Sequence, residues 1–249
     1  MRIRSAAVAC LAGLIITACA AGPVYTPAPA PAADAALTRA LGTEVAQFTA
    51  ADQASPPAPC RVLFVGSSSI RMWATLSEDM APLPVINRGF GGSHIEHVNR
   101  WFDELVQVNQ PGAIVLYAGE NDVADGKATR RVVADFAAFM KRKTAALGDT
   151  PVYFISLKPS KLRFGQLARQ REVNAAVRAI AAKRADLYYI DVASPMLEDG
   201  KPRDLFAPDD LHMTRDGYAI WTRSVRAALM PHAKSDASRC LSRVSRQAR

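Results

Sequence analysis

The chain has 249 residues, of which 49% are hydrophobic and 22% are charged. This composition is typical of a globular protein with one sizeable core, and it excludes a disordered chain or two ordinary domains. The formal net charge is +8, but residues 232–249 alone carry five basic residues against one acidic residue. No aromatic residues alternate with these charges, so the basic excess does not indicate a nucleic-acid-binding protein.

Residues 1–18 have the pattern of an export signal. Arg2 and Arg4 supply positive charge, and the small apolar run that follows them is too short to span a bilayer. The run ends in Ile16-Thr17-Ala18-Cys19, which resembles the lipobox of bacterial lipoproteins. That resemblance implies cleavage before Cys19 and a diacylglycerol on its thiol. Since Ala20 and not Asp follows the cysteine, it also implies sorting to the periplasmic face of the outer membrane. The alternative is an ordinary secretory signal with an incidental cysteine.

The elements expected next follow one another in a simple order. Residues 19–34 are rich in Pro and Ala and predict an extended tether. A helix is expected after it, with an apolar stripe that packs on the domain and is formed by Leu37, Leu41, Val45 and Phe48. The segment from Ser55 to Pro59 should end this helix.

Strand-like and helix-like segments then alternate to the end of the domain. The expected strands are 61–65, 84–87, 113–117, 152–157 and 187–192, and the expected helices are 70–76, 95–108, 128–147, 165–184 and 214–229. This alternation predicts right-handed crossovers and a parallel sheet in an α/β sandwich. The domain should cover residues 35–231, followed by a basic tail over 232–249. The tail is either solvated or in contact with anionic lipid headgroups near the anchor.

Polar residues of unusual chemistry follow each expected strand. Parallel strands present their carboxyl ends at one edge of the sheet, so these loops should meet there. The loops contain glycines, hydroxyls, an amide, carboxylates and an imidazole, in the segments 66–69, 88–94, 118–122, 158–160 and 208–212. Turn chemistry alone does not account for five loops of this composition.

Three common motifs fail on these loops. Gly89-Phe90-Gly91 lacks the third glycine of a dinucleotide fingerprint, because position 94 is a histidine. Gly66-Ser67-Ser68 lacks the second glycine of an α/β-hydrolase elbow, because position 70 is an isoleucine. His94 and His97 have the spacing of two metal ligands on one helix face, but no third ligand or zinc signature accompanies them. Surface or supporting histidines are the favoured interpretation, and no metal is expected.

A serine, a histidine and a carboxylate remain as a candidate catalytic set. A serine hydroxyl needs a base within hydrogen-bonding distance to become a nucleophile. His212 is the best candidate base, since Asp209 stands three residues before it and can fold back to fix its tautomer. The alternative role of Asp209 as a helix cap is less favoured because Thr214 already fits that position. Gly92 and Asn121 offer N–H donors for an oxyanion, although either could be structural.

Four sequence blocks together resemble the SGNH or GDSL hydrolases. The blocks are Gly66-Ser67-Ser68-Ser69, Asn87-Arg88-Gly89-Phe90-Gly91-Gly92, Gly119-Glu120-Asn121-Asp122 and Asp209-Asp210-Leu211-His212. The resemblance implies a flavodoxin-like α/β/α sandwich of three layers with five parallel strands. It implies that Ser68 is the nucleophile, and that the Ser68 and Gly92 N–H groups and the Asn121 amide form the oxyanion hole. Ser67 and Ser69 depart from the Asp and Leu of many members, so substrate preferences of better-known subfamilies do not transfer.

The function expected from these observations is that of a lipid-anchored serine esterase that needs no cofactor. Ser68, His212 and Asp209 would form its triad, and the absence of a long apolar lid favours short acyl chains. Its partners would be a small-molecule, glycan or lipid ester and the membrane, with no nucleic acid. The alternatives are an acyltransferase with the same triad and a non-catalytic surface lipoprotein that binds glycan or lipid.

A disulfide between Cys60 and Cys240 is also expected. Once Cys10 is removed with the signal and Cys19 is acylated, these two cysteines remain in an oxidising compartment. Cys60 precedes the first strand at the amino edge of the sheet. The last helix should run roughly 25 Å back from the carboxyl edge and bring the tail near it. The alternative is two free thiols.

Overall fold

Five parallel strands form one sheet in the computed structural model, which describes residues 32–247. Their order is β2-β1-β3-β4-β5, and their bounds are β1 Val62–Gly66, β2 Val85–Gly89, β3 Ala113–Tyr117, β4 Val152–Ile155 and β5 Leu187–Ile190. The predicted flavodoxin-like α/β sandwich with a five-stranded parallel sheet is therefore confirmed. The expected signal 1–18, Cys19 and most of the expected tether lie outside the described residues.

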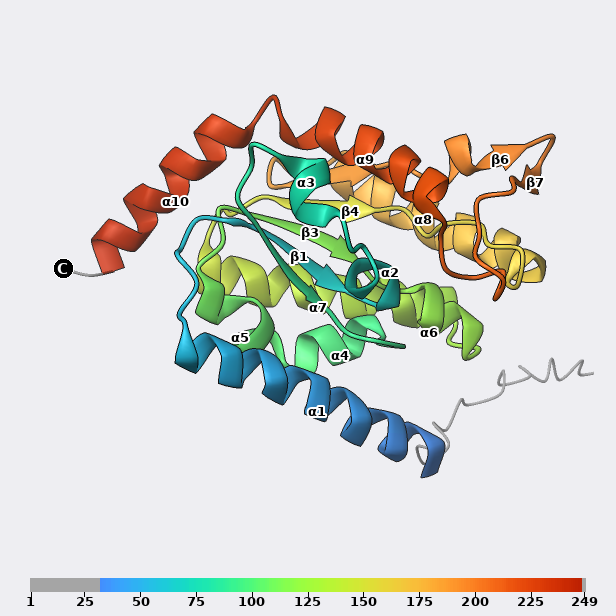
Figure 1. The fold of residues 1–249 in the computed structure, drawn as a ribbon, viewed down its shortest axis with the longest axis horizontal. Helices are drawn as coiled ribbons and strands as arrows, with labels where there is room; N and C mark the ends of the chain where they lie inside the picture. The colour runs from blue at the N-terminus through green and yellow to red at the C-terminus, as the bar shows by residue number, and fades with distance from the viewer. Residues whose placement is uncertain (1–31, 248–249) are drawn as a thin grey trace, which may run out of the picture.

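Helices cover both faces of the sheet (Figure 1). On one side Figure 1 shows α3 and α9, and on the other α1, α4, α5 and α7. The helix bounds are α1 Ala32–Ala54, α2 Ser68–Arg71, α3 Leu76–Met80, α4 Ile95–Arg100, α5 Phe102–Leu105, α6 Glu120–Ala124, α7 Thr129–Leu147, α8 Leu167–Ala181, α9 Arg215–Leu229 and α10 Ala233–Gln247. Short 3-10 turns (η1 Gln107–Asn109, η2 Phe164–Gln166, η3 Ser194–Met196) and a two-stranded ribbon (β6 Leu197–Glu198, β7 Lys201–Pro202) complete the order.

The core lies between the sheet and these two helical layers. Every residue of β1, β3 and β4 is buried, because helices cover both faces of these central strands and leave no polar side to the pleat. The stripe predicted on the leading helix is also present. Leu41 and Val45 of α1 are buried, and Leu37 and Phe48 pack against the core from partly buried positions.

Two of the predicted helices are interrupted. The segment expected as one helix over 95–108 forms α4, α5 and η1, with a break at Trp101 (φ −105°, ψ 33°). The Arg142 guanidinium from α7 donates to the Asn99 carbonyl, which competes with the helical bonding at this point. The segment expected as a helix over 70–76 contains only the turn α2 and the start of α3. Between the two helices, the Trp73 indole and the Thr75 hydroxyl donate to the Asp79 carboxylate of α3, both at 2.6 Å.

The last two strands are each two residues shorter than predicted. Beyond β4, the Asn174 side chain accepts from the Leu157 N–H at 2.7 Å and donates to the Leu157 carbonyl at 3.0 Å. Beyond β5, the Ser156 hydroxyl accepts from the N–H groups of Val192 and Ala193. At the carboxyl edge of the sheet, polar side chains therefore replace the backbone hydrogen bonds between strands. At this edge the chain turns into the functional loops.

The basic segment at the C-terminus is a helix and not a free solvated tail. In α10, Asp236 and Cys240 are buried, and Asp236 accepts a hydrogen bond from the Tyr153 hydroxyl of β4 at 3.0 Å. Arg243 donates to the Pro111 carbonyl at 3.0 Å and to the Thr150 hydroxyl. The expectation of a solvated tail was wrong, because these long-range contacts hold one face of the helix against the domain. Lys234, Arg239 and Arg246 remain exposed on it.

A disulfide joins α10 to the segment before β1. Cys60 and Cys240 are bonded with their Cα atoms 5.6 Å apart, and 180 residues separate them in the sequence. Closing so long a loop stabilises the fold by up to about 5 kcal/mol in the chain-entropy model.

Reduction of this bond is expected to lower the melting temperature by up to roughly 10–20 °C. Calorimetry of the protein with and without reductant checks this. The rate of the ester hydrolysis that the sequence leads us to expect should not change, because Cys60 precedes the amino end of β1 and the polar loops selected from the sequence follow the carboxyl ends of the strands. Two titratable thiols in the denatured, unreduced mature protein would contradict the pairing.

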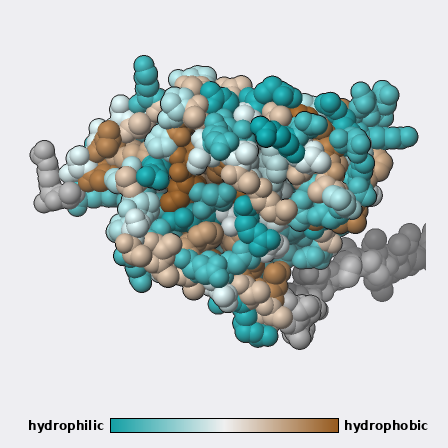
Figure 2. Space-filling model, in the orientation of Figure 1, coloured by the Kyte–Doolittle hydropathy of each residue, from teal (hydrophilic) through white to brown (hydrophobic). Residues whose placement is uncertain are grey.

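Exposed apolar residues are dispersed over the described surface. On the face drawn in Figure 2, hydrophobic patches are small and bordered by hydrophilic residues. The exposed large hydrophobic residues are Met72, Val108, Leu162, Phe164, Met230 and Leu241, of which Leu162 and Phe164 lie in one segment on either side of Arg163. Within residues 32–247, none of the helices has the length and apolar character needed to cross a membrane.

Candidate active site

Ser68 is the first residue of α2, directly after the carboxyl end of β1. The turn that leads to it depends on Gly66, whose φ of +138° is a conformation that residues with a side chain rarely adopt. A Cβ at Gly66 would also lie 1.9 Å from the Tyr117 carbonyl oxygen of β3. The next residue, Ser67, donates its backbone N–H to the same carbonyl at 2.9 Å. This close packing fixes the position at which Ser68 leaves the sheet.

Two neighbouring elements hold the α2 turn in place. From β2, the Asn87 side chain donates to the Ile70 carbonyl at 2.8 Å and accepts from the Gly89 N–H at 2.8 Å. A Cβ at Gly89 would lie 2.1 Å from the Arg71 nitrogen, so glycine is needed for this approach. From α9, the Tyr218 hydroxyl donates to the Ser69 carbonyl at 2.9 Å. Because α9 follows the loop of His212, this bond also ties the two halves of the site together.

Ser68, His212 and Asp209 lie in one hydrogen-bonded series. His212 Nε2 is 2.9 Å from Ser68 Oγ, and His212 Nδ1 is 2.6 Å from Asp209 Oδ2. An ionised carboxylate only accepts hydrogen bonds, so the proton of the neutral ring belongs on Nδ1. Nε2 is then an acceptor that faces the Ser68 hydroxyl. The structure thus brings together the three residues that the sequence selected from loops 144 positions apart.

The loop before α9 orients the Asp209 carboxylate toward His212. Asp209 Oδ1 accepts from the backbone N–H groups of Leu211 at 3.0 Å and His212 at 2.9 Å. The side-chain bond to His212 and these backbone bonds lower the pKa of Asp209 to about 2. Thr214 is the residue before α9, as expected from the sequence, although its hydroxyl donates to the Leu205 carbonyl at 3.1 Å. Asp209 is therefore bound to the imidazole and does not cap the helix.

The expected oxyanion donors follow three adjacent strands. Ser68 follows β1, Gly92 follows β2 and Asn121 follows β3, and Gly66 is in register with both Gly89 and Tyr117. Gly92 has a φ of +74°, and its N–H has no hydrogen-bond acceptor among the residues that the structure describes. Asn121 Nδ2 donates to the Ser93 carbonyl at 3.0 Å, which leaves its second N–H for another acceptor.

The leading helix α1 contacts the glycine loop directly. The Glu44 carboxylate accepts from the Gly91 N–H at 3.2 Å and from the Arg71 guanidinium at 3.1 Å. Leu37 lies beside Gly92, where an added Cβ would be 3.5 Å from its Cδ1 atom. The sequence indicated that this helix packs on the domain, and the structure places it against the site itself.

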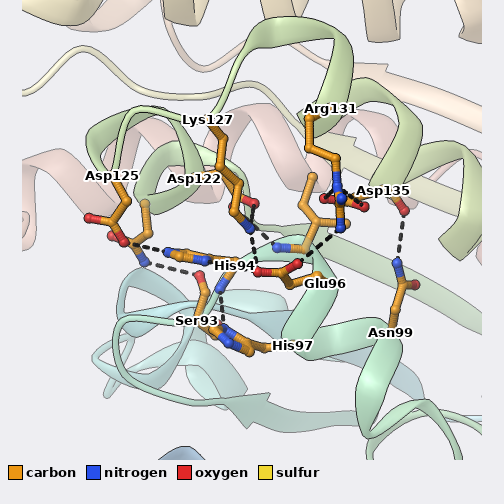
Figure 3. A network of polar contacts seen from close by, with 12 residues as sticks. Ser93, His94, Glu96, His97, Asn99, Asp122, Asp125, Lys127, Arg131 and Asp135 are labelled. Carbon is orange, nitrogen blue, oxygen red and sulfur yellow. Dashed lines mark hydrogen bonds and ion pairs between the residues drawn. The ribbon is translucent and has the colours of Figure 1, made fainter. Parts of the chain in front are cut away.

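The histidines His94 and His97 are buried, not on the surface, and belong to a polar network that joins α4 to α6 and α7 (Figure 3). His94 Nε2 is 2.7 Å from Asp125 Oδ2, while His97 Nδ1 accepts the His94 backbone N–H at 3.0 Å. Burial opposes protonation, but Glu96 and nearby aspartates raise the pKa of His94 above its ordinary value.

The same network explains why the two-histidine spacing is a poor metal site. The rings of His94 and His97 are stacked, with centroids 4.9 Å apart and planes 22° from parallel. One ligand atom from each of His94, Glu96 and His97 lies within 4.8 Å of the others, so the structure supplies a third potential ligand that the sequence spacing did not indicate. Glu96, the third potential ligand, is held by Lys127 at 2.5 Å and by Arg131 at 3.2 Å. These cations occupy the carboxylate oxygens that a metal ion would need.

Several residues near the site were not selected from the sequence. Glu44, Glu120, Lys158 and Arg163 all lie within the hydrogen-bonding network of the glycine loop or of Asn121. Glu120 and Lys158 belong to the polar segments 118–122 and 158–160, which the sequence already predicted at this edge of the sheet, so their place near the site could have been predicted. Arg163 lies five residues after Lys158, outside these polar segments, and no sequence pattern indicated a role for it.

A parallel α/β sandwich with serine, histidine and aspartate hydrogen-bonded in series at its carboxyl edge is the architecture of a serine hydrolase. The family model of the GDSL-like lipases and acylhydrolases matches residues 50–220, and the chain belongs to this family. It is therefore a hydrolase of the GDSL, or SGNH, esterase type. The comparison with curated proteins gives no match.

Solved structures share the fold at low sequence identity. A protein from Streptococcus pneumonia, described as a platelet activating factor, is 16% identical, with a TM-score of 0.71 over 79% of this chain and 96% of its own. A GDSL-like lipase from Bacteroides thetaiotaomicron is 21% identical, with a TM-score of 0.67 over 75% and 97%. An acetylxylan esterase from Geobacillus stearothermophilus is 14% identical, with a TM-score of 0.54 over 68% and 93%.

Proposed function

We propose that the protein is a lipid-anchored serine esterase that hydrolyses short-chain carboxylic esters. The series Ser68–His212–Asp209, with contacts of 2.9 and 2.6 Å, is the observation that carries this proposal. Its geometry supports proton transfer from a serine to a histidine whose orientation a carboxylate fixes.

In the proposed reaction, Ser68 Oγ attacks the ester carbonyl carbon while its proton moves to His212 Nε2. The negative charge on the former carbonyl oxygen is held by the N–H groups of Ser68, Gly92 and Asn121. The carbon–oxygen bond to the alcohol then breaks, and His212 returns the proton to the leaving alkoxide. Water repeats these steps on the acyl-enzyme and releases the carboxylic acid and free Ser68. The residues named here supply both proton transfer and charge stabilisation.

A small or polar substrate fits the surroundings of the triad. Ionic and amide side chains lie at the proposed oxyanion donors, with Glu44 and Arg71 paired beside the glycine loop and Arg163 bound to Asn121. Acetylxylan esterase and an acetyl esterase are among the structures with the same fold, which supports short acyl groups. A panel of nitrophenyl esters of increasing chain length tests this, with highest kcat/KM expected for acetate. A preference for long acyl chains would contradict it.

The anchor belongs to the proposal and depends on Cys19, outside the described residues. The lipobox-like Ile16-Thr17-Ala18-Cys19 supports a diacylglyceryl anchor, and Ala20 supports the outer membrane of a bacterial cell envelope. Metabolic labelling with palmitate and detergent phase partitioning should place the wild type in the detergent phase. The Cys19→Ser variant should be unlabelled. Recovery of unlabelled wild type in the aqueous phase would rule out the anchor.

Asn121→Ala is expected to lower kcat by roughly 10²–10³-fold with little change in KM, as for the loss of one oxyanion donor. Steady-state kinetics with nitrophenyl acetate measure both constants. Asn99→Ala is a matched control, because the Asn99 amide also donates to a backbone carbonyl, that of Asp135 at 2.9 Å, but lies away from the triad. A change confined to KM would show that Asn121 only binds substrate.

A further inference from the structure

The Asn121 side chain is held at both ends of its amide. Nδ2 donates to the Ser93 carbonyl at 3.0 Å, and Oδ1 accepts from Arg163 Nη1 at 2.9 Å. An amide has two N–H groups, so one remains after the bond to Ser93. A flipped amide would place Oδ1 against the Ser93 carbonyl and the NH₂ group against the guanidinium. It would therefore lose both bonds and create two repulsive contacts.

A buried carboxylate fixes Arg163 in turn. Glu120 is 3% exposed, and its Oε1 lies 3.3 Å from Arg163 Nη1. Its Oε2 accepts from Lys158 Nζ at 2.7 Å and from the Tyr117 hydroxyl. Burial opposes ionisation, but Lys158 and Arg163 hold the pKa of Glu120 below its ordinary value. Glu120 is thus an ionised anchor: its Oε2 accepts two hydrogen bonds, and its Oε1, which accepts none from the described residues, faces Arg163 as an ion pair.

The loop that carries Arg163 also contacts the triad loop. The backbone N–H of Leu162 donates to the Asp210 carbonyl at 3.0 Å, next to Asp209. The Arg163 side chain is 17% exposed, and its contacts to Glu120 and Asn121 are both with α6. Arg163 is therefore placed by the backbone on one side and by Glu120 on the other, with its Nη1 atom directed at Asn121.

We propose that Arg163 is a positioning residue that locks the Asn121 amide in the orientation that presents an N–H to the oxyanion. This inference rests on the proposed function, because it assigns a role within the proposed oxyanion hole. A guanidinium is suited to the role because it only donates, and so it binds the amide oxygen and repels the amide nitrogen. Arg163 does not itself need to contact substrate.

A double-mutant cycle tests whether Arg163 acts through Asn121. Arg163→Ala should lower kcat for nitrophenyl acetate by ~10–100-fold, the range of one hydrogen bond to a charged group, with KM nearly unchanged. In the Asn121→Ala background the same substitution should cost less than about twofold. Arg163→Lys keeps the charge and a donor and should recover part of kcat. Losses that multiply in the double variant, or an effect on KM alone, would overturn the proposal and indicate a substrate contact.

Lys161→Ala is the matched control for this cycle. Lys161 is an exposed cation of the same loop, two residues before Arg163, and it pairs with Asp204 at 2.6 Å. Its removal changes the loop charge by the same amount without touching Asn121. The control should keep wild-type kcat and KM. A loss in this variant equal to that of Arg163→Ala would overturn the proposal by showing a general effect of charge or loop structure.

A second measurement does not depend on turnover. The side-chain NH₂ signals of Asn121 in a ¹⁵N-correlated NMR spectrum can be assigned by their absence in Asn121→Ala. In Arg163→Ala these signals should shift and broaden, while Lys161→Ala should leave them unchanged. Unchanged signals in Arg163→Ala would overturn the positioning role. If the wild type neither hydrolyses esters nor reacts with a serine-directed phosphonate, the proposed function fails, and the NMR result still decides the contact.

Discussion

Ser68→Ala is expected to abolish ester hydrolysis, with a fall in kcat of at least about 10⁴-fold, because no other group takes over nucleophilic attack. Ser67→Ala and Ser69→Ala should retain activity within about tenfold. The contacts that both serines make in the turn use backbone atoms: the Ser67 N–H donates to Tyr117, and the Ser69 carbonyl accepts from Tyr218. These bonds survive the loss of either hydroxyl, so the two variants are matched controls for the turn.

Labelling identifies the nucleophile independently of kinetics. A serine-directed phosphonate followed by peptide mapping should place the label on Ser68, and thermal melts of Ser68→Ala should match the wild type. The spatial reason is that Ser68 Oγ is the hydroxyl of the three that lies 2.9 Å from His212 Nε2, while Ser67 and Ser69 are buried. A label on either neighbour would refute the assignment.

The sheet was predictable because its central strands are continuously apolar and its loops are chemically distinctive. The runs that became β3 and β4 are continuously apolar, as strands covered on both faces are, and the alternation with helices indicated parallel order. Once the strands are parallel, their carboxyl ends must meet. For this reason residues as distant in sequence as Ser68, Asn121 and His212 could be expected in one place before any geometry was known.

Other features depend on contacts that no local pattern reveals. The break at Trp101 coincides with a hydrogen bond from Arg142 of α7 to the Asn99 carbonyl. The helix α10 is anchored by the bond between Asp236 and Tyr153, 83 residues apart, whereas the basic charge of this segment had suggested a tail that is solvated or in contact with lipid headgroups. The role of Arg163 likewise depends on its contacts with Glu120 and Asn121, which are distant from it in the sequence. In each case a long-range polar contact decides the outcome, and such contacts have no periodicity in the sequence.

Asp209→Asn is expected to lower kcat on the order of 10³–10⁴-fold near neutral pH while the fold is preserved. The Oδ1 atom of an asparagine can still accept from the Leu211 and His212 N–H groups, so the loop keeps its shape. The amide nitrogen would then face His212 Nδ1 and donate to it. This contact favours the tautomer with a proton on Nε2, which cannot accept the proton of Ser68. Kinetics with nitrophenyl acetate, together with a thermal melt, separate this loss from unfolding.

The matched control for this substitution is Asp210→Asn. Asp210 is exposed and has a φ of +54°, a conformation that asparagine adopts readily, so the change removes the same charge without strain. It should keep activity near that of the wild type. Equal losses in both variants would show a general charge effect and refute the role of Asp209 in fixing the tautomer.

The pH profile of the wild type separates the effect of protonating Asp209 from the effect of protonating the catalytic base. The pKa of Asp209 lies below its ordinary value, at about 2, so the stability from its bonds is present above about pH 4 and is lost as the pH falls toward 2. Between pH 5 and 8 the carboxylate stays ionised and cannot cause a change in rate. Turnover should nevertheless fall on acidification, because the group that accepts the proton of Ser68 must be unprotonated. A rate that is independent of pH from 5 to 8, in a protein that remains folded, would contradict histidine as the base.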